Sequence, residues 1–240
     1  QEASKYLNFT AQKTMMLAQQ LYEGIEIRGN GTVGLVSYIR TDSVRISDEA
    51  YENASEYIKE NLGEKYLPDE RNIYKTKKNA QDAHEAIRPT YATMTPDKIK
   101  ESLSNDQYKL YKLIYERFIA SQMTEAKLET TSVSFDANGC TYRSTGTKVL
   151  FPGYTAIYTE GRDDGAEEEA VIPAVNAKDV FKAEKVEKEQ KFSQPPARYT
   201  EASLVKLLEE KGIGRPSTYA PTISTIIERG YVRREKKQLV

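Results

Sequence analysis

The sequence of 240 residues has one cysteine, one histidine and no tryptophan. The lone Cys140 excludes an internal disulfide bond and a cysteine-based zinc cluster, which suits a reducing cytoplasm. Apolar runs such as residues 149–151 are far too short to cross a membrane. The chain opens on Gln1 without an initiator Met or an apolar signal segment. We therefore expect a cytoplasmic protein whose sequence starts at a cut site.

An excess of charge of one sign is also missing, because the formal net charge is -1. This balance does not favour a generic basic nucleic-acid binder. The charges are nevertheless segregated, with acidic residues gathered at 163–169 and basic residues near the C-terminus at Arg229, Arg233, Arg234, Lys236 and Lys237. Charged residues make up 30% and hydrophobic residues 38%, a composition typical of a folded chain rather than a disordered one.

Residues 1–125 are predicted to be mainly helical. Three helices are expected to begin at the N-cap residues Thr10, Ser47 and Ser104. Ser104 and Gln107 have the spacing of a capping box. Between the first two helices, residues 33–39 form a short apolar run that predicts a strand.

Residues 126–190 change to the alternating pattern of strands. Asn-Gly at 138–139 predicts a hairpin turn. Residues 149–151 and 154–158 predict further strands, and the acidic stretch 160–169 is expected to be a solvated loop. This region is therefore interpreted as a small antiparallel β-domain.

Residues 191–240 predict a helix, a tight turn at 212–214, a second helix starting at 216–218 and a strand starting at 231–232. Helix, turn, helix and basic strand is the order typical of a winged helix. We expect this unit to be unfinished at Val240. The expected fold class is therefore α+β and multidomain, with winged-helix-like elements, a small antiparallel β-domain and a helical C-terminal segment.

Two motif matches are better explained without a cofactor or a metal. Residues 29–34 fit G-x-G-x-x-G, but a dinucleotide site needs a helix after this motif, and here a strand is predicted. His84 and Glu85 begin like a zinc-protease motif, but Arg88 stands where the second histidine is needed. We therefore expect no metal site in this chain.

The first informative stretch is residues 34–43, Gly-Leu-Val-Ser-Tyr-Ile-Arg-Thr-Asp-Ser. In an extended strand Tyr38 and Arg40 would face the same side. A phenol, with a pKa of about 10, needs help to act as a nucleophile. The Arg40 guanidinium could stabilise a phosphoryl centre under attack, and Asp42 could orient that guanidinium. The alternative is an ordinary strand with one buried tyrosine and a surface ion pair.

The second stretch places His84 four residues before Arg88, just ahead of the helix-breaking Pro89. The two side chains could grip a phosphate, and the alternative is a surface histidine with no ligand. In the third stretch, Arg215 precedes a predicted helix that starts with Ser217 and Thr218. Free N–H groups there could bind a nucleic-acid phosphate, and the alternative is simple N-capping by either hydroxyl.

Together these stretches resemble the signatures of bacterial type IA DNA topoisomerases. Gly-Leu-Val-Ser-Tyr-Ile-Arg-Thr-Asp-Ser is similar to the active-site motif, and Ala-His-Glu-Ala-Ile-Arg-Pro-Thr at 83–90 is similar to the second signature. Arg-Tyr-Thr-Glu-Ala-Ser-Leu-Val at 198–205 and Gly-Ile-Gly-Arg-Pro-Ser-Thr-Tyr at 212–219 are similar to the third. The order and spacing also match, so the resemblance covers essentially the whole chain.

The resemblance implies that Tyr38 attacks one DNA strand, forms a 5′-phosphotyrosine link and later religates it after strand passage. Because the covalent intermediate keeps the phosphodiester energy, negatively supercoiled DNA would be relaxed without ATP. Arg40 would stabilise the scissile phosphate, and His84 would position the DNA backbone with Arg88 as a weaker candidate. A groove for single-stranded DNA is implied for Arg215, Ser217, Thr218 and Arg229.

The resemblance also implies three domains: a tyrosine-bearing domain at 1–125, a β-rich hinge at 126–190 and the start of a groove domain at 191–240. The family's Mg²⁺ ions are bound by a Toprim domain, which is absent from this sequence. The implied partners are DNA, mainly its single-stranded segments, and the remaining domains of the same polypeptide. No membrane partner is expected, and the implied location is the bacterial nucleoid.

Two other readings remain open from the residues alone. A non-enzymatic winged-helix module would explain the basic C-terminus, but it leaves the Tyr38 and His84 stretches unexplained. A protein-interaction fragment that works only when docked to other domains is the third reading. Formation of a covalent adduct between Tyr38 and a single-stranded oligonucleotide would separate the enzyme from both.

Overall fold

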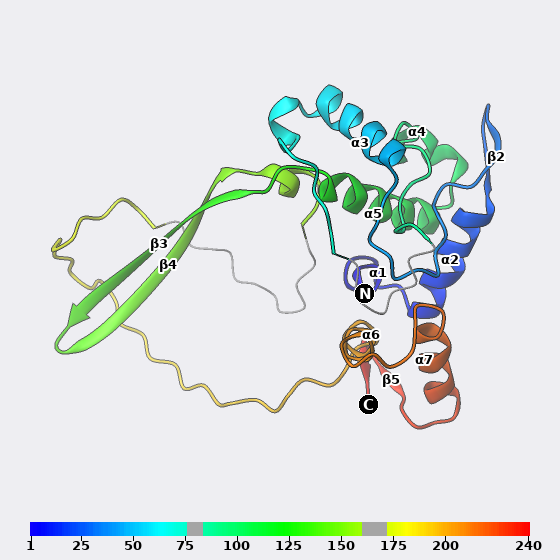
Figure 1. Cartoon of the computed structure of the whole chain (residues 1–240). Coiled ribbons are helices and arrows are strands. Elements are labelled where there is room, and N and C mark those ends of the chain that lie inside the picture. Colours follow the sequence, from blue (N-terminus) through cyan, green and yellow to red (C-terminus); the bar gives the residue numbers. More distant parts are fainter. Residues whose placement is uncertain (76–83, 160–171) are drawn as a thin grey trace.

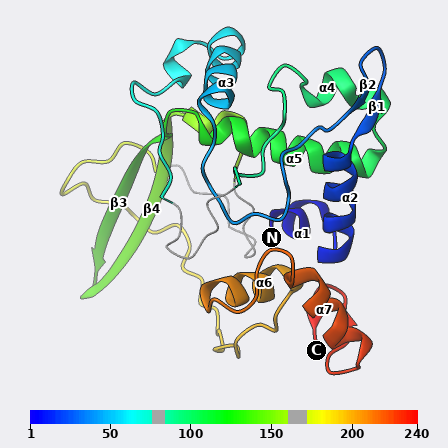
Figure 2. The same ribbon diagram turned by 45° about the vertical axis from the view of Figure 1, so that its right-hand side comes forward.

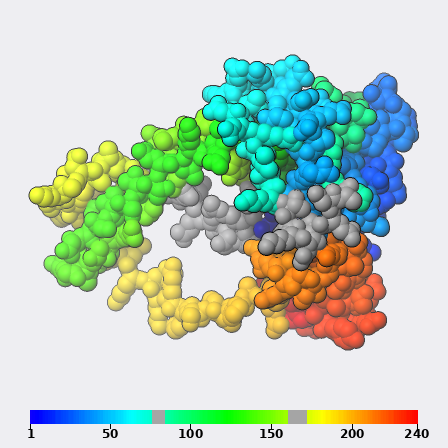
Figure 3. All heavy atoms as spheres, in the orientation of Figure 1, coloured from blue at the N-terminus to red at the C-terminus, as the bar shows by residue number. Residues whose placement is uncertain are grey.

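The structure is a computed structural model that describes residues 1–75, 84–159 and 172–240. A body of helices carries a long projecting hairpin, and two C-terminal helices lie along one side of the body (Figures 1 and 2). In the space-filling view the hairpin and the extended residues that follow it stand away from the body (Figure 3). The architecture is thus a mixture of helices and small antiparallel sheets, as the sequence predicted at this level.

Three helices of the body begin where the sequence predicted, and the two short ones at 2–7 and 96–99 were not predicted. The helices are α1 (Glu2–Leu7), α2 (Ala11–Glu23), α3 (Asp48–Asn61), α4 (Pro96–Ile99) and α5 (Asn105–Ser121), with 3-10 turns η1 (Glu64–Tyr66) and η2 (Lys100–Ser102). Thr10 and Ser47 each accept a hydrogen bond from a backbone N–H of the first turn. Ser104 and Gln107 form both bonds of the capping box. All three predicted N-caps are confirmed.

The core of the body lies where α2, α3 and α5 meet the chain that follows β2. Leu21, Leu35, Ile58, Tyr111 and Ile119 are at most 1% exposed. The buried Tyr111 hydroxyl donates to a backbone carbonyl oxygen at 2.7 Å, so its burial leaves no unpaired polar group. Burial also raises the pKa of Tyr111 well above its usual range. This core holds α2 and the segment after β2 in fixed relative positions.

The predicted strand at 33–39 is wrong for most of its length. A short hairpin of β1 (Ile25–Ile27) and β2 (Gly31–Val33) follows α2, and β2 ends at Val33. Beyond it only Val36 makes a bridge, to Pro89. The ladder stops there because the Leu35 N–H donates to the Leu21 carbonyl oxygen, and the Arg88 N–H donates to the Ser37 hydroxyl rather than to its backbone oxygen. The apolar run is buried because it crosses the core, which a hydrophobicity pattern cannot distinguish from a strand.

The predicted hairpin turn is confirmed. β3 (Lys127–Ala137) and β4 (Cys140–Phe151) pair antiparallel along their length, and the two residues between them have positive φ angles of 53° and 76°. Residues 149–151 belong to β4. Among the described residues of 126–190, the only sheet is this two-stranded one. The ring of Phe181, further along the chain, packs against Phe135 of β3, with 5.7 Å between the ring centroids.

The strand predicted at 154–158 is wrong, because the chain forms the 3-10 turn η3 (Gly153–Ala156). At Gly153 the backbone has a φ of 51°, and a Cβ there would lie 2.4 Å from the Glu125 carbonyl oxygen. This close approach turns the chain back onto α5 and prevents an extended conformation. The predicted acidic loop at 160–169 lies outside the described residues.

The C-terminal unit has the predicted order of helix, turn, helix and strand, and this strand pairs with a second one that was not predicted. Its elements are α6 (Glu201–Glu210), α7 (Tyr219–Glu228), β5 (Arg234–Glu235) and β6 (Gln238–Leu239). The strand begins at Arg234 rather than at 231–232, because Tyr231 and Val232 donate to the Ile226 carbonyl oxygen and complete the end of α7.

A buried carboxylate joins this C-terminal unit to the body. Glu201 is 6% exposed, and its Oε2 accepts a hydrogen bond from the Ala11 N–H at 2.7 Å. Its other oxygen pairs with the Arg234 guanidinium. Figure 2 shows α6 and α7 beside α1 and α2. Glu201 therefore caps the first turn of α2 from another unit of the chain, with the charge sign that a helix N-terminus favours.

Candidate active site

The ring of Tyr38 contacts two other rings, those of His84 and Tyr22. The His84 ring centroid is 4.5 Å from that of Tyr38, with an interplanar angle of 38°. The Tyr22 ring meets Tyr38 edge-on at 5.7 Å and 72°. Tyr38 is half-buried, and His84 is exposed. The site therefore combines the end of α2, the segment after β2 and the segment that starts at residue 84.

Backbone hydrogen bonds bring the first two predicted motifs together. The Ser37 N–H donates to the Arg88 carbonyl oxygen at 2.9 Å, and the Thr90 N–H donates to the Leu35 carbonyl oxygen at 2.9 Å. These bonds flank the bridge between Val36 and Pro89. The antiparallel crossing sets Tyr38 beside His84, an arrangement that sequence spacing alone did not indicate.

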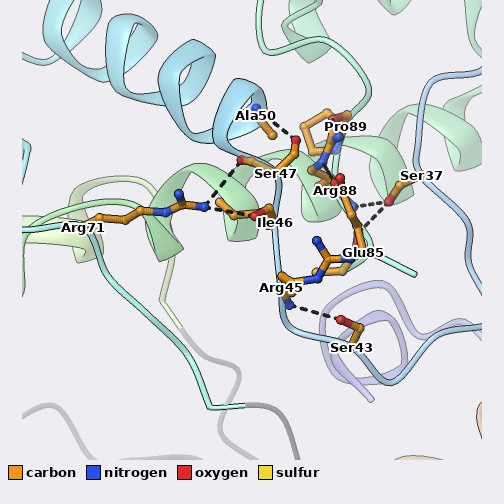
Figure 4. Close-up of polar contacts among 11 residues, drawn as sticks. Ser37, Ser43, Arg45, Ile46, Ser47, Ala50, Arg71, Glu85, Arg88 and Pro89 are labelled. Carbon is orange, nitrogen blue, oxygen red and sulfur yellow. Dashed lines mark hydrogen bonds and ion pairs between the residues drawn. The ribbon is translucent and has the colours of Figure 1, made fainter. Parts of the chain in front are cut away.

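The Ser37 side chain also stabilises the crossing of the segments that contain Val36 and Pro89. Its hydroxyl donates to the Ala86 carbonyl oxygen at 2.7 Å and accepts from the Arg88 N–H at 2.9 Å (Figure 4). The Arg88 guanidinium is engaged inside the loop, with Glu85 at 2.7 Å and the Pro89 carbonyl oxygen at 3.0 Å. The structure thus uses Arg88 to hold the loop in shape.

Ser37→Ala is expected to lower the free energy of unfolding by about 1–3 kcal/mol, because it removes both bonds and leaves the Arg88 N–H without its partner. Thermal unfolding of the variant measures this loss. Ser132→Ala, on the exposed hairpin, is the matched control and should change stability little. Equal unfolding temperatures for Ser37→Ala and wild type would show that the two Ser37 hydrogen bonds do not stabilise the crossing.

Arg40 and Asp42 do not lie as the sequence predicted. The chain bends at Ile39 and Arg40, so the alternation of an extended strand does not apply here. Arg40 is exposed and makes no hydrogen bond or ion pair to the described parts of the chain. The Asp42 carboxylate instead pairs with Arg215 at 3.5 Å. Asp42 therefore does not orient Arg40 as predicted. Its ion pair with Arg215 instead connects the first motif to the third.

The sequence offered two interpretations of the start of α7: free N–H groups that bind a phosphate, or N-capping by the Ser217 or Thr218 hydroxyl. The structure shows a different arrangement. No side chain caps α7, and the Thr218 hydroxyl bonds the Arg215 backbone N–H at 2.8 Å instead. The Arg215 carbonyl oxygen accepts from the Thr218 and Tyr219 N–H groups, and Pro221 has no N–H. The backbone groups at the start of α7 are thus largely satisfied by hydrogen bonds within residues 215–219.

The remaining predicted groove residues are exposed but separated. Ser217, Thr218 and Arg215 lie at the start of α7, and Arg229 is its C-cap. A helix of this length spans about 15 Å. Of these four residues, Arg215 contacts the Tyr38 motif, through Asp42. Tyr22 was not predicted, since a tyrosine near the end of an amphipathic helix carries no signal of its own.

The described residues offer no metal centre and no membrane span. No group of three or more His, Cys, Asp or Glu side chains among them could hold a metal ion. In residues 1–75, 84–159 and 172–240, no helix combines the length and apolarity needed to cross a bilayer.

Comparison with known proteins agrees with the resemblance of the three motifs. A protein-family model described as DNA topoisomerase matches residues 1–240. The structure of full-length topoisomerase I from Thermotoga maritima is similar to this chain, with a TM-score of 0.79 and 40% sequence identity over 99% of it. The match spans 38% of that protein. The chain belongs to the DNA topoisomerase family.

Proposed function

We propose that this chain provides the nucleophile with which a type IA topoisomerase relaxes negatively supercoiled DNA without ATP. Tyr38 would attack a phosphodiester, form a 5′-phosphotyrosine intermediate and be released on religation after strand passage. The observation that supports this most is that the segment carrying Tyr38 contacts both other signature segments, through the rings of Tyr38 and His84 and through the ion pair of Asp42 with Arg215. A structural tyrosine would not need this convergence.

The surrounding cations have separate proposed tasks. Arg40, exposed and without a partner in the described chain, would stabilise the negative charge that develops on the scissile phosphate. His84 would position the DNA backbone while its ring packs against Tyr38, and Arg88 would support the loop that carries His84. Arg215, Ser217, Thr218 and Arg229 would line the path of the single strand.

The proposed division of labour follows the order of the chain. Residues 1–125 would form the tyrosine-bearing domain, 126–190 the hinge and 191–240 part of the groove domain. The projecting hairpin of β3 and β4 suits a hinge, because it stands away from the body (Figure 3). The proposed setting is the bacterial cytoplasm, with DNA and the other domains of the polypeptide as partners.

Mg²⁺ is proposed to act through a separate Toprim domain. The described residues of this chain hold no suitable cluster of metal-binding side chains. Carboxylates and waters are the ligands that Mg²⁺ prefers. This chain would therefore contribute the nucleophile and phosphate-binding cations, and another domain of the polypeptide would contribute the metal site.

Binding is expected to favour single-stranded over blunt duplex DNA, because exposed cations such as Arg40 and Arg229 would follow one backbone. The logarithm of the affinity should fall with the logarithm of salt concentration, at a slope of about -0.7 per phosphate neutralised. Fluorescence anisotropy of labelled oligonucleotides at matched ionic strength measures both. A preference for duplex DNA would contradict the proposed groove.

The 240-residue chain alone is expected not to relax supercoiled DNA. Cleavage needs protonation of the departing 3′ oxygen as well as a nucleophile, and the resemblance assigns that acid to the Toprim domain. The test incubates the chain with negatively supercoiled plasmid and Mg²⁺, with a Toprim-containing enzyme as positive control. Relaxed products that vanish in the Tyr38→Phe version would show the chain to be self-sufficient.

A further inference from the structure

Tyr22 is the third member of the ring cluster at the active site, and the three motifs do not include it. It lies next to the last residue of α2 and meets the Tyr38 ring edge-on, at 5.7 Å and 72°. Its side chain remains 38% exposed, and it is not part of the hydrophobic core that contains its neighbour Leu21. Tyr22 therefore touches the proposed nucleophile without contributing appreciably to the core.

The backbone fixes the spacing between Tyr22 and the segment that carries Tyr38. The Leu35 N–H donates to the Leu21 carbonyl oxygen at 2.8 Å. Gly34 passes so close to α2 that a Cβ there would lie 2.9 Å from the Tyr22 carbonyl oxygen. This approach leaves little freedom for the segment to move along the helix. The rings of Tyr22 and Tyr38 are consequently held in register by the main chain.

His84 contacts the same Tyr38 ring at 4.5 Å. Two aromatic contacts on one phenol restrict rotation of its ring, and edge-on pairs at this spacing are a favourable aromatic geometry. We propose that Tyr22 is a positioning residue that holds the Tyr38 ring so that its hydroxyl faces the scissile phosphate. The inference rests on the proposed function, and it assigns the effect to the ring of Tyr22 rather than to its hydroxyl.

The positioning would act on the rate of cleavage rather than on DNA affinity. Chemistry of this kind requires the attacking oxygen in a narrow range of positions, and a misplacement of about 1 Å can cost about 10²-fold in rate. Tyr22→Leu keeps a helix-forming apolar residue but removes the aromatic edge. Tyr22→Phe retains that edge and should restore the rate.

The chain offers a matched control in a second edge-on pair. The rings of Tyr57 and Tyr115 lie 5.8 Å apart at 90°, and both residues pack in or against the core. Tyr57→Leu makes the same chemical change where the ring serves packing. It should lower the unfolding temperature and leave the cleavage rate per folded molecule unchanged.

The experiment measures single-turnover cleavage of a labelled single-stranded oligonucleotide by an enzyme that contains this chain and a Toprim domain. At saturating DNA, Tyr22→Leu should cleave about tenfold or more slowly than wild type. The Kd for DNA and the unfolding temperature should stay near wild type, and Tyr22→Phe should cleave at the wild-type rate.

Two results would overturn the inference while the proposed function stands. Tyr22→Leu could cleave as fast as wild type, or Tyr22→Phe could be as slow as Tyr22→Leu, which would implicate the hydroxyl. A loss of rate matched by a loss of folded protein would also overturn it, because the ring would then be structural. Absence of a Tyr38 adduct in wild type would instead refute the proposed function, and the inference with it.

Discussion

Tyr38→Phe is expected to abolish DNA cleavage while leaving DNA binding largely intact. The substitution removes the phenolic oxygen that would bond to phosphorus, and no other group at that position can form the ester. It retains the ring, so the contacts with Tyr22 and His84 at 5.7 and 4.5 Å should persist. The measurement is the covalent adduct with a labelled single-stranded oligonucleotide, resolved under denaturing conditions, in an enzyme that carries a Toprim domain.

Tyr108→Phe is the matched control for this loss of a hydroxyl. Tyr108 lies on α5, where its hydroxyl donates to the Asp97 carboxylate at 2.8 Å, and the ring contacts of Tyr38 are with Tyr22 and His84 instead. Its removal should leave the adduct yield unchanged. An adduct that persists in Tyr38→Phe would assign the nucleophile to another residue, and unchanged binding in the same sample would confirm that the protein is folded.

Arg40→Ala is expected to lower the cleavage rate by about 10²-fold, comparable to loss of one donor that stabilises a developing negative charge. The exposed guanidinium makes no ion pair to the described chain, so its substitution should not disturb the fold. Arg40→Lys should recover only part of the rate, since an ammonium lacks the planar, bidentate geometry of guanidinium. Single-turnover cleavage at saturating DNA measures both variants.

The control for Arg40 is another exposed arginine. The Arg28 side chain is 90% exposed and forms an ion pair with Glu101 at 3.8 Å. Arg28 lies in the turn between β1 and β2, before the Tyr38 motif begins. Arg28→Ala removes the same charge and should leave the rate near wild type. Equal rates for wild type and Arg40→Ala would remove Arg40 from the proposed mechanism.

The sequence was sufficient for features whose hydrogen bonds are local. Thr10, Ser47 and Ser104 each bond a backbone N–H three residues further on, so their helix starts could be predicted without knowledge of the fold. The hairpin turn at 138–139 needs positive φ at both residues, which Asn and Gly tolerate. The family was also evident from the sequence, because its three signatures are contiguous stretches.

Tertiary contacts decided where the local patterns failed. The apolar run at 33–39 and the Tyr-rich run at 154–158 both have strand-like composition. The first run cannot extend its ladder because the Leu35 N–H donates to Leu21 and the Arg88 N–H donates to the Ser37 hydroxyl. The close approach of Gly153 to Glu125 turns the second run into a 3-10 helix. In both cases the deciding contact is with a residue distant in the sequence, which no short window contains.

The sequence by itself determined which residues are proposed for the site, since Tyr38, Arg40 and His84 lie within recognisable motifs. Only the tertiary structure decided how the segments that carry them are arranged. The crossing at Val36 and Pro89 sets His84 on Tyr38, the end of α2 adds Tyr22, and Asp42 pairs with Arg215 instead of Arg40. Hydrogen bonds and ring contacts act only over a few ångströms. They therefore form only because the core holds these separate segments at fixed distances.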